Sequence, residues 1–287
     1  GIGGFMMELW FDEMHNKYSK LSMKVKEHLC SVESPFQKID VLDTYEYGRV
    51  LVLDGFIMLT EKDEFVYHEM IVHTPLAVNP DIKKVLVIGA GDGGTLRELT
   101  RYKTIESIDF VEIDKMVVEI SKKYLPFLNK GFDDERITAY FKDGIEFVKG
   151  KENIYDLIII DSTDPIGPGE GLFTTEFYNN CYKALNNKGI LVNQCESAFY
   201  EKDRAEFERA IKKLKNIFPI TEVYQANIPT YASGNWLFGF ASKNYHPIKD
   251  HKPAEWEKLK LDTKYYNSKL HKGSFYLPNY ILDILGK

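Results

Sequence analysis

Three glycines and two acids between residues 85 and 112 carry the first sign of chemistry in this sequence. Gly89, Gly91 and Gly94 follow the apolar run VLVI with the spacing G-x-G-x-x-G, and a helical segment comes directly after them. That context is typical of a loop that approaches a nucleoside closely. Glu112 ends the next strand about twenty residues downstream, where an acid can bind ribose hydroxyls. Asp92 stands in the loop itself, and its carboxylate would repel a phosphate group.

Two further acids follow a continuously apolar strand. Asp161 and Asp164 lie in the segment IIIDSTDP. Doubly wound sheets bind their ligands at the carboxyl ends of the strands. The first and fourth strands are neighbours in the usual order, roughly 4.8 Å apart, so we expect Asp92 and Asp161 to face each other across one crevice. A turn or a helix cap could explain any single acid, whereas three acids at one edge favour a positively charged ligand.

A cationic nucleoside fits this edge better than NAD or ATP, whose phosphates would meet Asp92. S-adenosylmethionine is such a ligand, but its carboxylate would also lie near the loop. Two like charges ~4 Å apart repel by about 4 kcal/mol at an effective dielectric constant of ~20. The decarboxylated form should therefore bind better by roughly two to three orders of magnitude.

The elements that must position these acids alternate between strands and helices. We expect strands in KVLVIG, SIDFVEID, ITAYFKD, YDLIIID and GILVNQC, with helices in GTLRELTRY, KMVVEISKKYLP, GIEFVKGK and TTEFYNNCYKALNN. This order predicts an α/β fold, namely a Rossmann-like, methyltransferase-type, doubly wound and mostly parallel sheet. ITEVYQANI and NWLFGFASK should add an antiparallel edge. In the last forty or so residues we expect only a terminal helix near NYILDIL.

A different pattern precedes this region. From about residue 22 to residue 60, short apolar stretches alternate and are separated by glycines that are typical of hairpin turns. We expect a small N-terminal antiparallel β domain over residues 6–62 and a catalytic domain with a C-terminal extension over residues 63–287. The segment EKDEFVYHEMIVHTPLAV should form a helix. Tyr67 and His68 in that helix, and Tyr231 in the later loop PTYASG, are ambiguous on the residues alone.

The composition excludes several classes of protein. The chain of 287 residues has a formal net charge of −6 and no long block of Lys and Arg, so we expect no nucleic-acid partner. We also expect no membrane span and no leader segment. Cys30, Cys181 and Cys195 are far apart and indicate buried thiols in a reducing, cytoplasmic compartment. The spacing of His, Cys and carboxylate residues indicates no metal site.

The chain resembles the spermidine synthases, the polyamine aminopropyltransferases, over nearly its whole length. The resemblance lies in MKVKEHLCSVESPFQKIDV, LVLDGFIMLTEKDEFVYHEMIVHTPL, VLVIGAGDGGTLREL, VEIDKMVVEISKKYLP, YDLIIIDSTDPIGP and NIPTYASGNWLFGFASK. It implies transfer of the aminopropyl group of decarboxylated S-adenosylmethionine to putrescine, which gives spermidine and 5′-methylthioadenosine. It also implies no metal or other cofactor, and a homodimer or homotetramer. Ala90 departs from the family, which often has a glycine there, and we expect its methyl group to be tolerated.

The resemblance also implies roles for matching residues. Those implied at the nucleoside end are Gln37, Gly89, Gly91, Glu112, Asp143, Gly144 and Pro168. Those implied in the amine channel are Tyr67, His68, Asp92, Asp161, Asp164 and Tyr231. A primary alkylamine has a pKa near ~10.4, so the neutral attacking form is scarce at neutral pH. Asp161, assisted by Tyr67, is the expected proton acceptor, and Asp164 is expected to anchor the distal ammonium group.

Three alternatives stay open at this point. An aminopropyltransferase could use spermidine, cadaverine or agmatine as the acceptor. A putrescine N-methyltransferase would use S-adenosylmethionine itself, but the acids in GAGDGG and DSTDP favour aminopropyl transfer. A non-catalytic, methyltransferase-like binding module is the alternative outside the enzymes, and the intact set Tyr67, Asp161 and Asp164 argues against it.

Overall fold

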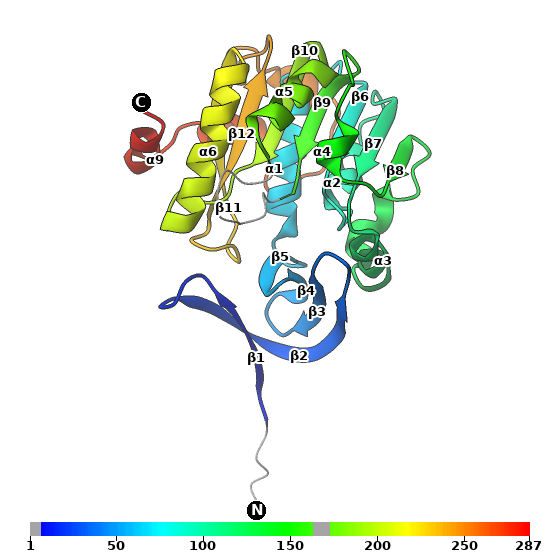
Figure 1. Cartoon of the computed structure of the whole chain (residues 1–287), viewed down its shortest axis with the longest axis vertical. Coiled ribbons are helices and arrows are strands. Elements are labelled where there is room, and N and C mark those ends of the chain that lie inside the picture. The colour runs from blue at the N-terminus through cyan, green and yellow to red at the C-terminus, as the bar shows by residue number, and fades with distance from the viewer. Residues whose placement is uncertain (1–6, 163–172) are drawn as a thin grey trace, which may run out of the picture.

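The larger of two β-sheets is built around the strand that carries the continuously apolar run LIII, residues 157–160. The computed structural model describes residues 7–162 and 173–287 (Figure 1). Its larger sheet has the order β11-β12-β10-β9-β6-β7-β8. These strands are β6 (Lys84–Ile88), β7 (Ser107–Val111), β8 (Ile137–Tyr140), β9 (Tyr155–Ile160), β10 (Leu185–Gln194), β11 (Ile220–Asn227) and β12 (Asn235–Ser242). The strands β8, β7, β6, β9 and β10 pair in parallel, and β12 and β11 add the antiparallel edge. The predicted fold class is therefore confirmed, and so is the expected pairing of β6 with β9.

Helices cover both faces of this sheet, which explains why β9 is apolar on both sides. Val85 and Val87 pack on one face with α1 (Glu64–Leu76) and α2 (Gly94–Leu99). Leu86 and Ile88 pack on the other face, and that core also includes residues of α5 (Thr175–Ala184), α6 (Glu201–Ile217) and α9 (Asn279–Ile284). Beside them lie α3 (Lys115–Tyr124), the 3-10 helix η1 (Pro126–Gly131) and α4 (Gly144–Phe147). Successive residues of β6 thus pack into two different hydrophobic cores.

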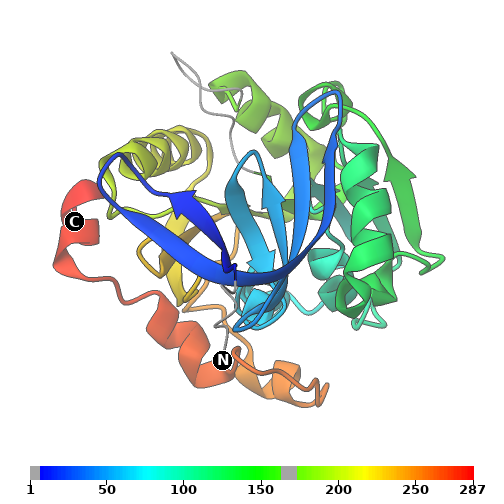
Figure 2. The same cartoon turned by 90° about the horizontal axis from the view of Figure 1, so that it is seen from below.

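The smaller sheet lies at the N-terminal end of the chain and is antiparallel, as expected. It has the order β1-β2-β3-β4-β5. Its strands are β1 (Leu9–Met14), β2 (Lys20–Glu33), β3 (Lys38–Thr44), β4 (Gly48–Leu53) and β5 (Phe56–Thr60). The sheet begins before the expected residue 22 because β1 pairs along β2, from Leu9 with Val25 to Met14 with Lys20. Figure 2 shows β2 as a long, curved strand across this layer.

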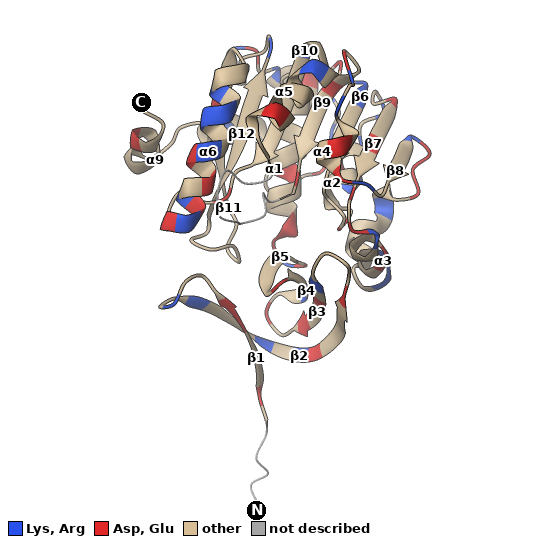
Figure 3. Ribbon diagram, viewed as in Figure 1, with Lys and Arg blue, Asp and Glu red and all other residues tan. Residues whose placement is uncertain are grey.

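Several helical segments differ from the sequence prediction, among them α6 and α5. Helix α6 was not predicted, although Phe207, Ile211 and Leu214 are buried at helical spacing. Its charged residues of both signs follow one another closely (Figure 3), so few apolar positions mark its buried face. Helix α5 ends at Ala184, three residues earlier than expected, because Leu185 already pairs with β9 at the start of β10.

The C-terminal extension binds to the outside of α1. Beyond β12 it contains α7 (Pro253–Glu257), α8 (Ser268–Ser274) and α9, and it runs along one side of the molecule (Figure 2). The expectation of only a terminal helix was therefore wrong, because α7 and α8 are short and bury too few residues to leave an apolar periodicity in the sequence. The main anchor of the extension is Glu69 of α1, whose carboxylate accepts hydrogen bonds from the backbone N–H groups of Lys264, Tyr265 and Tyr266 at 3.0, 2.8 and 3.0 Å. Helix α1 is therefore buried along nearly its whole length.

None of the helices in residues 7–162 and 173–287 combines the length and the apolar character that a membrane crossing requires.

Candidate active site

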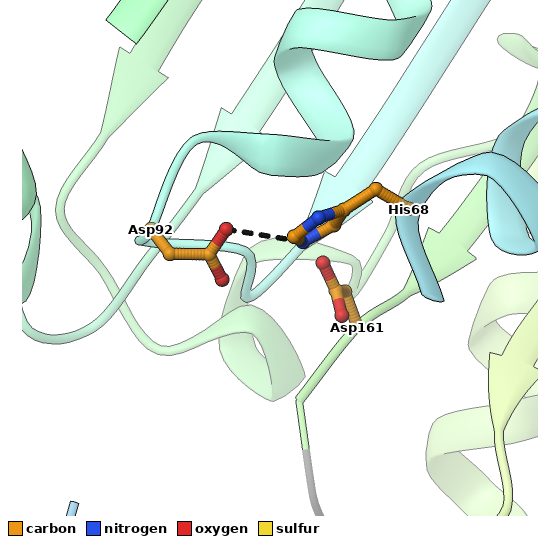
Figure 4. A group of neighbouring side chains, drawn as sticks. All are labelled: His68, Asp92 and Asp161. Atoms are coloured by element: carbon orange, nitrogen blue, oxygen red, sulfur yellow. Dashed lines mark ion pairs between the residues drawn. The ribbon is translucent and has the colours of Figure 1, made fainter. Parts of the chain in front are cut away.

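The carboxyl ends of β6 and β9 bring the two predicted acids together. Ile88 pairs with Ile160, and the N–H group of Asp161 donates to the carbonyl oxygen of Ile88 at 2.8 Å. The loop that carries Asp92 therefore lies beside the residue that follows β9. One ligand-type atom each from His68, Asp92 and Asp161 lies within 4.8 Å of the other two (Figure 4). Three separate elements, α1, the β6–α2 loop and the end of β9, thus meet at one point.

Asp161 is held by two hydroxyl groups. Tyr67 donates to Oδ1, and Thr95 donates to Oδ2 at 2.7 Å. Removal from water raises the pKa of Asp161, and the nearby charge of Asp92 raises it further, while His68 and the two hydroxyl donors oppose the shift. The pKa of Asp161 rises to about 7. A carboxylate tuned in this way can both accept and release a proton near neutral pH.

His68 lies between two carboxylates and is almost fully buried. Its Nδ1 is 2.6 Å from Oε2 of Glu64, and its Nε2 is 3.2 Å from Oδ1 of Asp92. Burial alone would lower the pKa of His68, but Asp92 and Glu64 outweigh burial and raise it to about 10. The same imidazolium, with the Gly94 N–H group, keeps the pKa of Asp92 below its ordinary value against the effect of burial. His68 is therefore a cation and Asp92 an anion at neutral pH.

The glycine loop makes room for side chains as well as for a ligand. A Cβ atom at Gly94 would lie 2.1 Å from the His68 ring, and one at Gly91 would lie 2.6 Å from Oε1 of Glu112. Ala90 has φ +68°, in the left-handed region that favours glycine. Its methyl group is accommodated, as expected, but the backbone carries a strain of roughly 1 kcal/mol.

His68, Asp92 and Asp161 offer three ligand atoms that a metal ion could use on distance alone. A protonated ring nitrogen has no lone pair for a metal, and both nitrogens of His68 face carboxylate oxygens. The donor set therefore suits an ion-pair cluster better than a metal centre.

Tyr67 and Tyr231 form an aromatic wall beside Asp161. Their ring centroids are 6.1 Å apart, and Phe238 lies 5.4 Å from the Tyr67 ring. Burial, followed by the charge of Asp161, holds the pKa of both phenols well above the usual value, so both are neutral donors. The Tyr231 hydroxyl donates to the Met58 carbonyl of β5, which ties this wall to the smaller sheet.

Asp63 fixes the loop that carries Tyr231. Its Oδ1 accepts from the Thr60 hydroxyl at 2.7 Å, and its Oδ2 accepts from the N–H and hydroxyl groups of Thr230 at 3.0 and 2.6 Å. One buried carboxylate thus joins the end of β5, the start of α1 and the β11–β12 loop.

The residues predicted for the nucleoside end gather around Glu112. The N–H groups of Gly91 and Asp114 donate to its carboxylate, and burial, followed by the charge of Asp114, raises its pKa to about 7. Gln37 donates to Asp114 at 3.0 Å and so lies next to Glu112. The side chain of Asp143 instead caps α4, where it accepts a hydrogen bond from the N–H group of Ile145.

The remaining predicted residues fall into two sets. Gly89 and Gly144 lie at the edge of the sheet, where Gly89 directly follows β6 and Gly144 packs against Ile88. Asp164 and Pro168 lie outside the described residues.

Sequence reasoning missed three residues that complete the site, namely Glu64, Thr95 and Arg97. Glu64 precedes His68 by four residues, the spacing that places two side chains on one face of a helix, and this signal could have found it. Thr95 and Arg97 follow the glycine loop in α2 and reach Asp161 and Glu64, respectively. Because these partners lie in other elements, no local sequence pattern indicates the roles of Thr95 and Arg97.

Two protein-family models match this chain. Residues 64–252 match the family model described as "Spermine/spermidine synthase domain". Residues 9–61 match the model described as "Spermidine synthase tetramerisation domain".

Individual relatives cover almost the entire chain. The polyamine aminopropyltransferase of Alkaliphilus metalliredigens is 61% identical over 96% of this chain and 98% of its own length. That of Lachnoclostridium phytofermentans is 58% identical over 98% and 99%. The crystal structure of spermidine synthase from Thermotoga maritima superposes with a TM-score of 0.92 at 43% identity, over 97% of this chain and 94% of that one. A spermidine synthase in complex with the transition state analogue AdoDATO gives 0.93 at 43% identity, over 97% and 95%.

The raised pKa of Asp161 predicts a pH-dependent gain in stability when its charge is removed. In the unfolded chain this carboxyl titrates near ~3.9, whereas in the folded protein it titrates at about 7. Below about pH 4 the carboxyl is protonated in both states and does not change the free energy of unfolding. Between about pH 4 and pH 7 it lowers that free energy progressively, and above about pH 7 the loss is complete. We expect the stability of Asp161→Asn relative to the wild type to rise by about 1–3 kcal/mol between pH ~4.5 and pH ~8.

Thermal and urea unfolding across this pH range measure the difference. Asp143→Asn, a change of the same kind at the exposed N-cap of α4, is the matched control and should show a smaller change. A flat difference for Asp161→Asn would contradict the raised pKa.

Proposed function

Because this chain belongs to the spermine/spermidine synthase family and is a polyamine aminopropyltransferase, we propose that it transfers the aminopropyl group of decarboxylated S-adenosylmethionine to putrescine. The products are spermidine and 5′-methylthioadenosine, and the reaction uses no metal or other cofactor. The observation that carries this proposal is the acidic, hydroxyl-lined cluster around Asp161 at the carboxyl ends of β6 and β9. A cluster of this kind suits an amine that must lose a proton.

The donor site combines a nucleoside end with an anionic end. In this proposal Glu112 accepts hydrogen bonds from the ribose hydroxyls, and Gln37 is linked to Glu112 through Asp114. The ionised Asp92 favours a donor without a carboxylate. Because His68 offsets part of this charge, the discrimination against S-adenosylmethionine is smaller than an isolated carboxylate would give.

The acceptor site must deliver a neutral amine to the methylene carbon next to sulfur. The amine nitrogen forms the new bond to this carbon, the carbon–sulfur bond breaks, and its electron pair stays on sulfur as the thioether. Asp161 takes the proton that the nitrogen loses, and Tyr67 orients Asp161. With a pKa of about 7, Asp161 is a far better base than an ordinary aspartate at ~3.9. Asp164 is proposed to anchor the distal ammonium group, and alignment of two bound substrates supplies much of the rate.

We propose further that the enzyme is a homodimer or homotetramer that assembles through the smaller sheet. The match of residues 9–61 to a tetramerisation domain supports this. Leu9, Trp10 and Met14 of the edge strand β1 are 52, 54 and 50% exposed, and such apolar exposure on an edge strand is typical of an interface. Three free cysteines support a reducing, cytoplasmic location.

The identity of the thionucleoside product tests the reaction. The protein is incubated with decarboxylated S-adenosylmethionine or with S-adenosylmethionine, together with putrescine, cadaverine, agmatine or spermidine. We expect methylthioadenosine only with the decarboxylated donor, and fastest turnover with putrescine. Formation of S-adenosylhomocysteine would contradict the proposal, and faster turnover with another amine would correct the acceptor.

The pH dependence of the rate tests the proton acceptor. Asp161 must be ionised to accept a proton, so kcat/KM for the amine should fall as the pH decreases through about 7. Asp161→Asn should lower kcat by about 10²–10⁴-fold. Asp92→Asn removes a like charge that raises the Asp161 pKa, so the fall should move to lower pH, with weaker binding of donor and amine. Near-normal turnover of Asp161→Asn would show that another group accepts the proton.

Light scattering of the protein in solution tests the assembly. Trp10→Glu places a charge on the exposed face of β1, so we expect a smaller oligomer than the wild type forms. Tyr276→Glu, at an equally apolar and 70% exposed position in the C-terminal extension, is the control and should leave the mass unchanged. An unchanged mass for Trp10→Glu would place the interface elsewhere.

A further inference from the structure

A buried pair of charged residues supports His68 on the side that faces away from Asp92. Glu64 accepts from Arg97 through both oxygens, at 2.7 Å for Nη1 and 3.0 Å for Nη2. The Oε2 atom of Glu64 is also 2.6 Å from Nδ1 of His68. The side chains of Glu64 and Arg97 are only 8 and 15% exposed. Charges are rarely buried to this extent unless they are paired, so each of these residues depends on the next.

The charged groups around His68 come from three directions. Glu64 faces it from α1, Asp92 from the β6–α2 loop, and Asp161 from the end of β9. Arg97 of α2 reaches it only through Glu64, and the neutral Tyr67 ring lies 5.4 Å away at its edge. One carboxylate oxygen lies 2.6 Å from Nδ1 and another lies 3.2 Å from Nε2, and each attraction is favourable when that nitrogen carries a proton. The ring is therefore held as an imidazolium.

We propose that Glu64 is a positioning residue for the transfer reaction, which keeps the His68 ring protonated and oriented beside the place where the acceptor amine loses its proton. This inference rests on the proposed function. It adds a residue that contacts neither substrate and acts through His68.

The chemical consequence follows from like charges. A ring nitrogen of His68 lies within 4.8 Å of a carboxylate oxygen of Asp161, so an amine bound to Asp161 is also close to the imidazolium. A fixed cation disfavours the ammonium form of a neighbouring amine and thereby lowers the pKa of that amine. Asp161 then accepts the proton from a group that already tends to release it. Glu64 is needed because it keeps the His68 ring protonated, and a neutral ring would not lower the pKa of the amine.

Arg97 has a different role, which can be tested separately from that of Glu64. It holds the Glu64 carboxylate in place with two parallel hydrogen bonds, and its Nε donates to Glu98 at 3.0 Å. Its own positive charge, however, competes with His68 for Glu64. Loss of Glu64 and loss of Arg97 should therefore change the pKa of His68 in opposite directions.

Nuclear magnetic resonance of the protein with labelled histidines measures this pKa without any turnover. The chain has seven histidines, and the signal that is lost in His68→Gln is assigned to His68. In the wild type we expect a doubly protonated ring from about pH 6 to about pH 9. Glu64→Gln should lower the titration midpoint by one pH unit or more, to a value within about pH 7 to 9. Arg97→Gln should not lower it.

The rate profile provides the second measurement. With saturating donor, kcat/KM for the amine should fall in Glu64→Gln as the pH rises through the new His68 pKa, by about 10-fold or more at pH ~9. The KM for the donor should change little. Arg97→Gln should keep the wild-type shape of the profile, even if its thermal stability falls.

Glu69→Gln is the matched control for loosening of α1. Glu69 lies on the same helix and is equally buried, but it binds the C-terminal extension instead of His68. Its substitution should lower the melting temperature without moving the His68 titration. The proposal is overturned by an unchanged His68 titration in Glu64→Gln, by a shifted titration with an unchanged rate profile, or by the same changes in Glu69→Gln.

The outcomes also separate this inference from the proposed function. Wild-type protein that forms no methylthioadenosine from either donor would overturn the proposed function, and with it the role of Glu64 in the reaction. A fully active wild type whose His68 titrates alike in Glu64→Gln would overturn only the role of Glu64.

Discussion

The site depends on one buried imidazolium that is shared by more negative charge than it can neutralise. His68 contacts Glu64 and Asp92 directly and lies near Asp161. The positive charge of Arg97 compensates the negative charge of Glu64. The positive charge of His68 therefore mainly compensates that of Asp92. Asp161 is the acid without a full counter-charge, and a carboxylate in that position takes up a proton more readily than usual. The basicity that the proposed chemistry needs is thus a result of incomplete charge compensation.

A network of buried ion pairs and hydrogen bonds extends from Arg97 away from this cluster. Arg97 contacts Glu98, which lies 2.9 Å from Nε2 of His73, and His73 Nδ1 is 2.6 Å from the Tyr102 hydroxyl. Trp256 of the C-terminal extension donates to the same hydroxyl at 2.8 Å. Because buried polar groups are costly when a partner is missing, each member of this network fixes the rotamer of the next. The network joins α1, α2 and the extension into one support for the site.

The sequence predicted well what depends on local pattern. Runs such as LIII and the glycine loop indicate the strands, and the usual strand order of a doubly wound sheet predicts that Asp92 lies beside Asp161. The sequence predicted less well where an element is mostly polar, as in α6, or where strand pairing ends a helix early, as at Leu185.

Residues whose partners lie in distant elements were also missed. Thr95, Arg97 and the C-terminal extension have such partners. The spacing between Glu64 and His68 was visible in the sequence, but its meaning depends on Asp92, which only the folded chain brings to the other side of the ring. The same holds for Gly94, which the loop pattern assigned to the ligand and whose missing Cβ gives space to His68.

The junction at Asp63 limits how the molecule can move. Two-domain enzymes commonly open and close by a hinge in the segment that links the domains. Here that segment is three residues long, from the end of β5 to the start of α1, and Asp63 within it is bonded to Thr60 and Thr230. A rotation between the sheets would break these bonds and separate Tyr231 from Met58. These hydrogen bonds therefore oppose a hinge motion between the two sheets and hold Tyr231 against the smaller sheet.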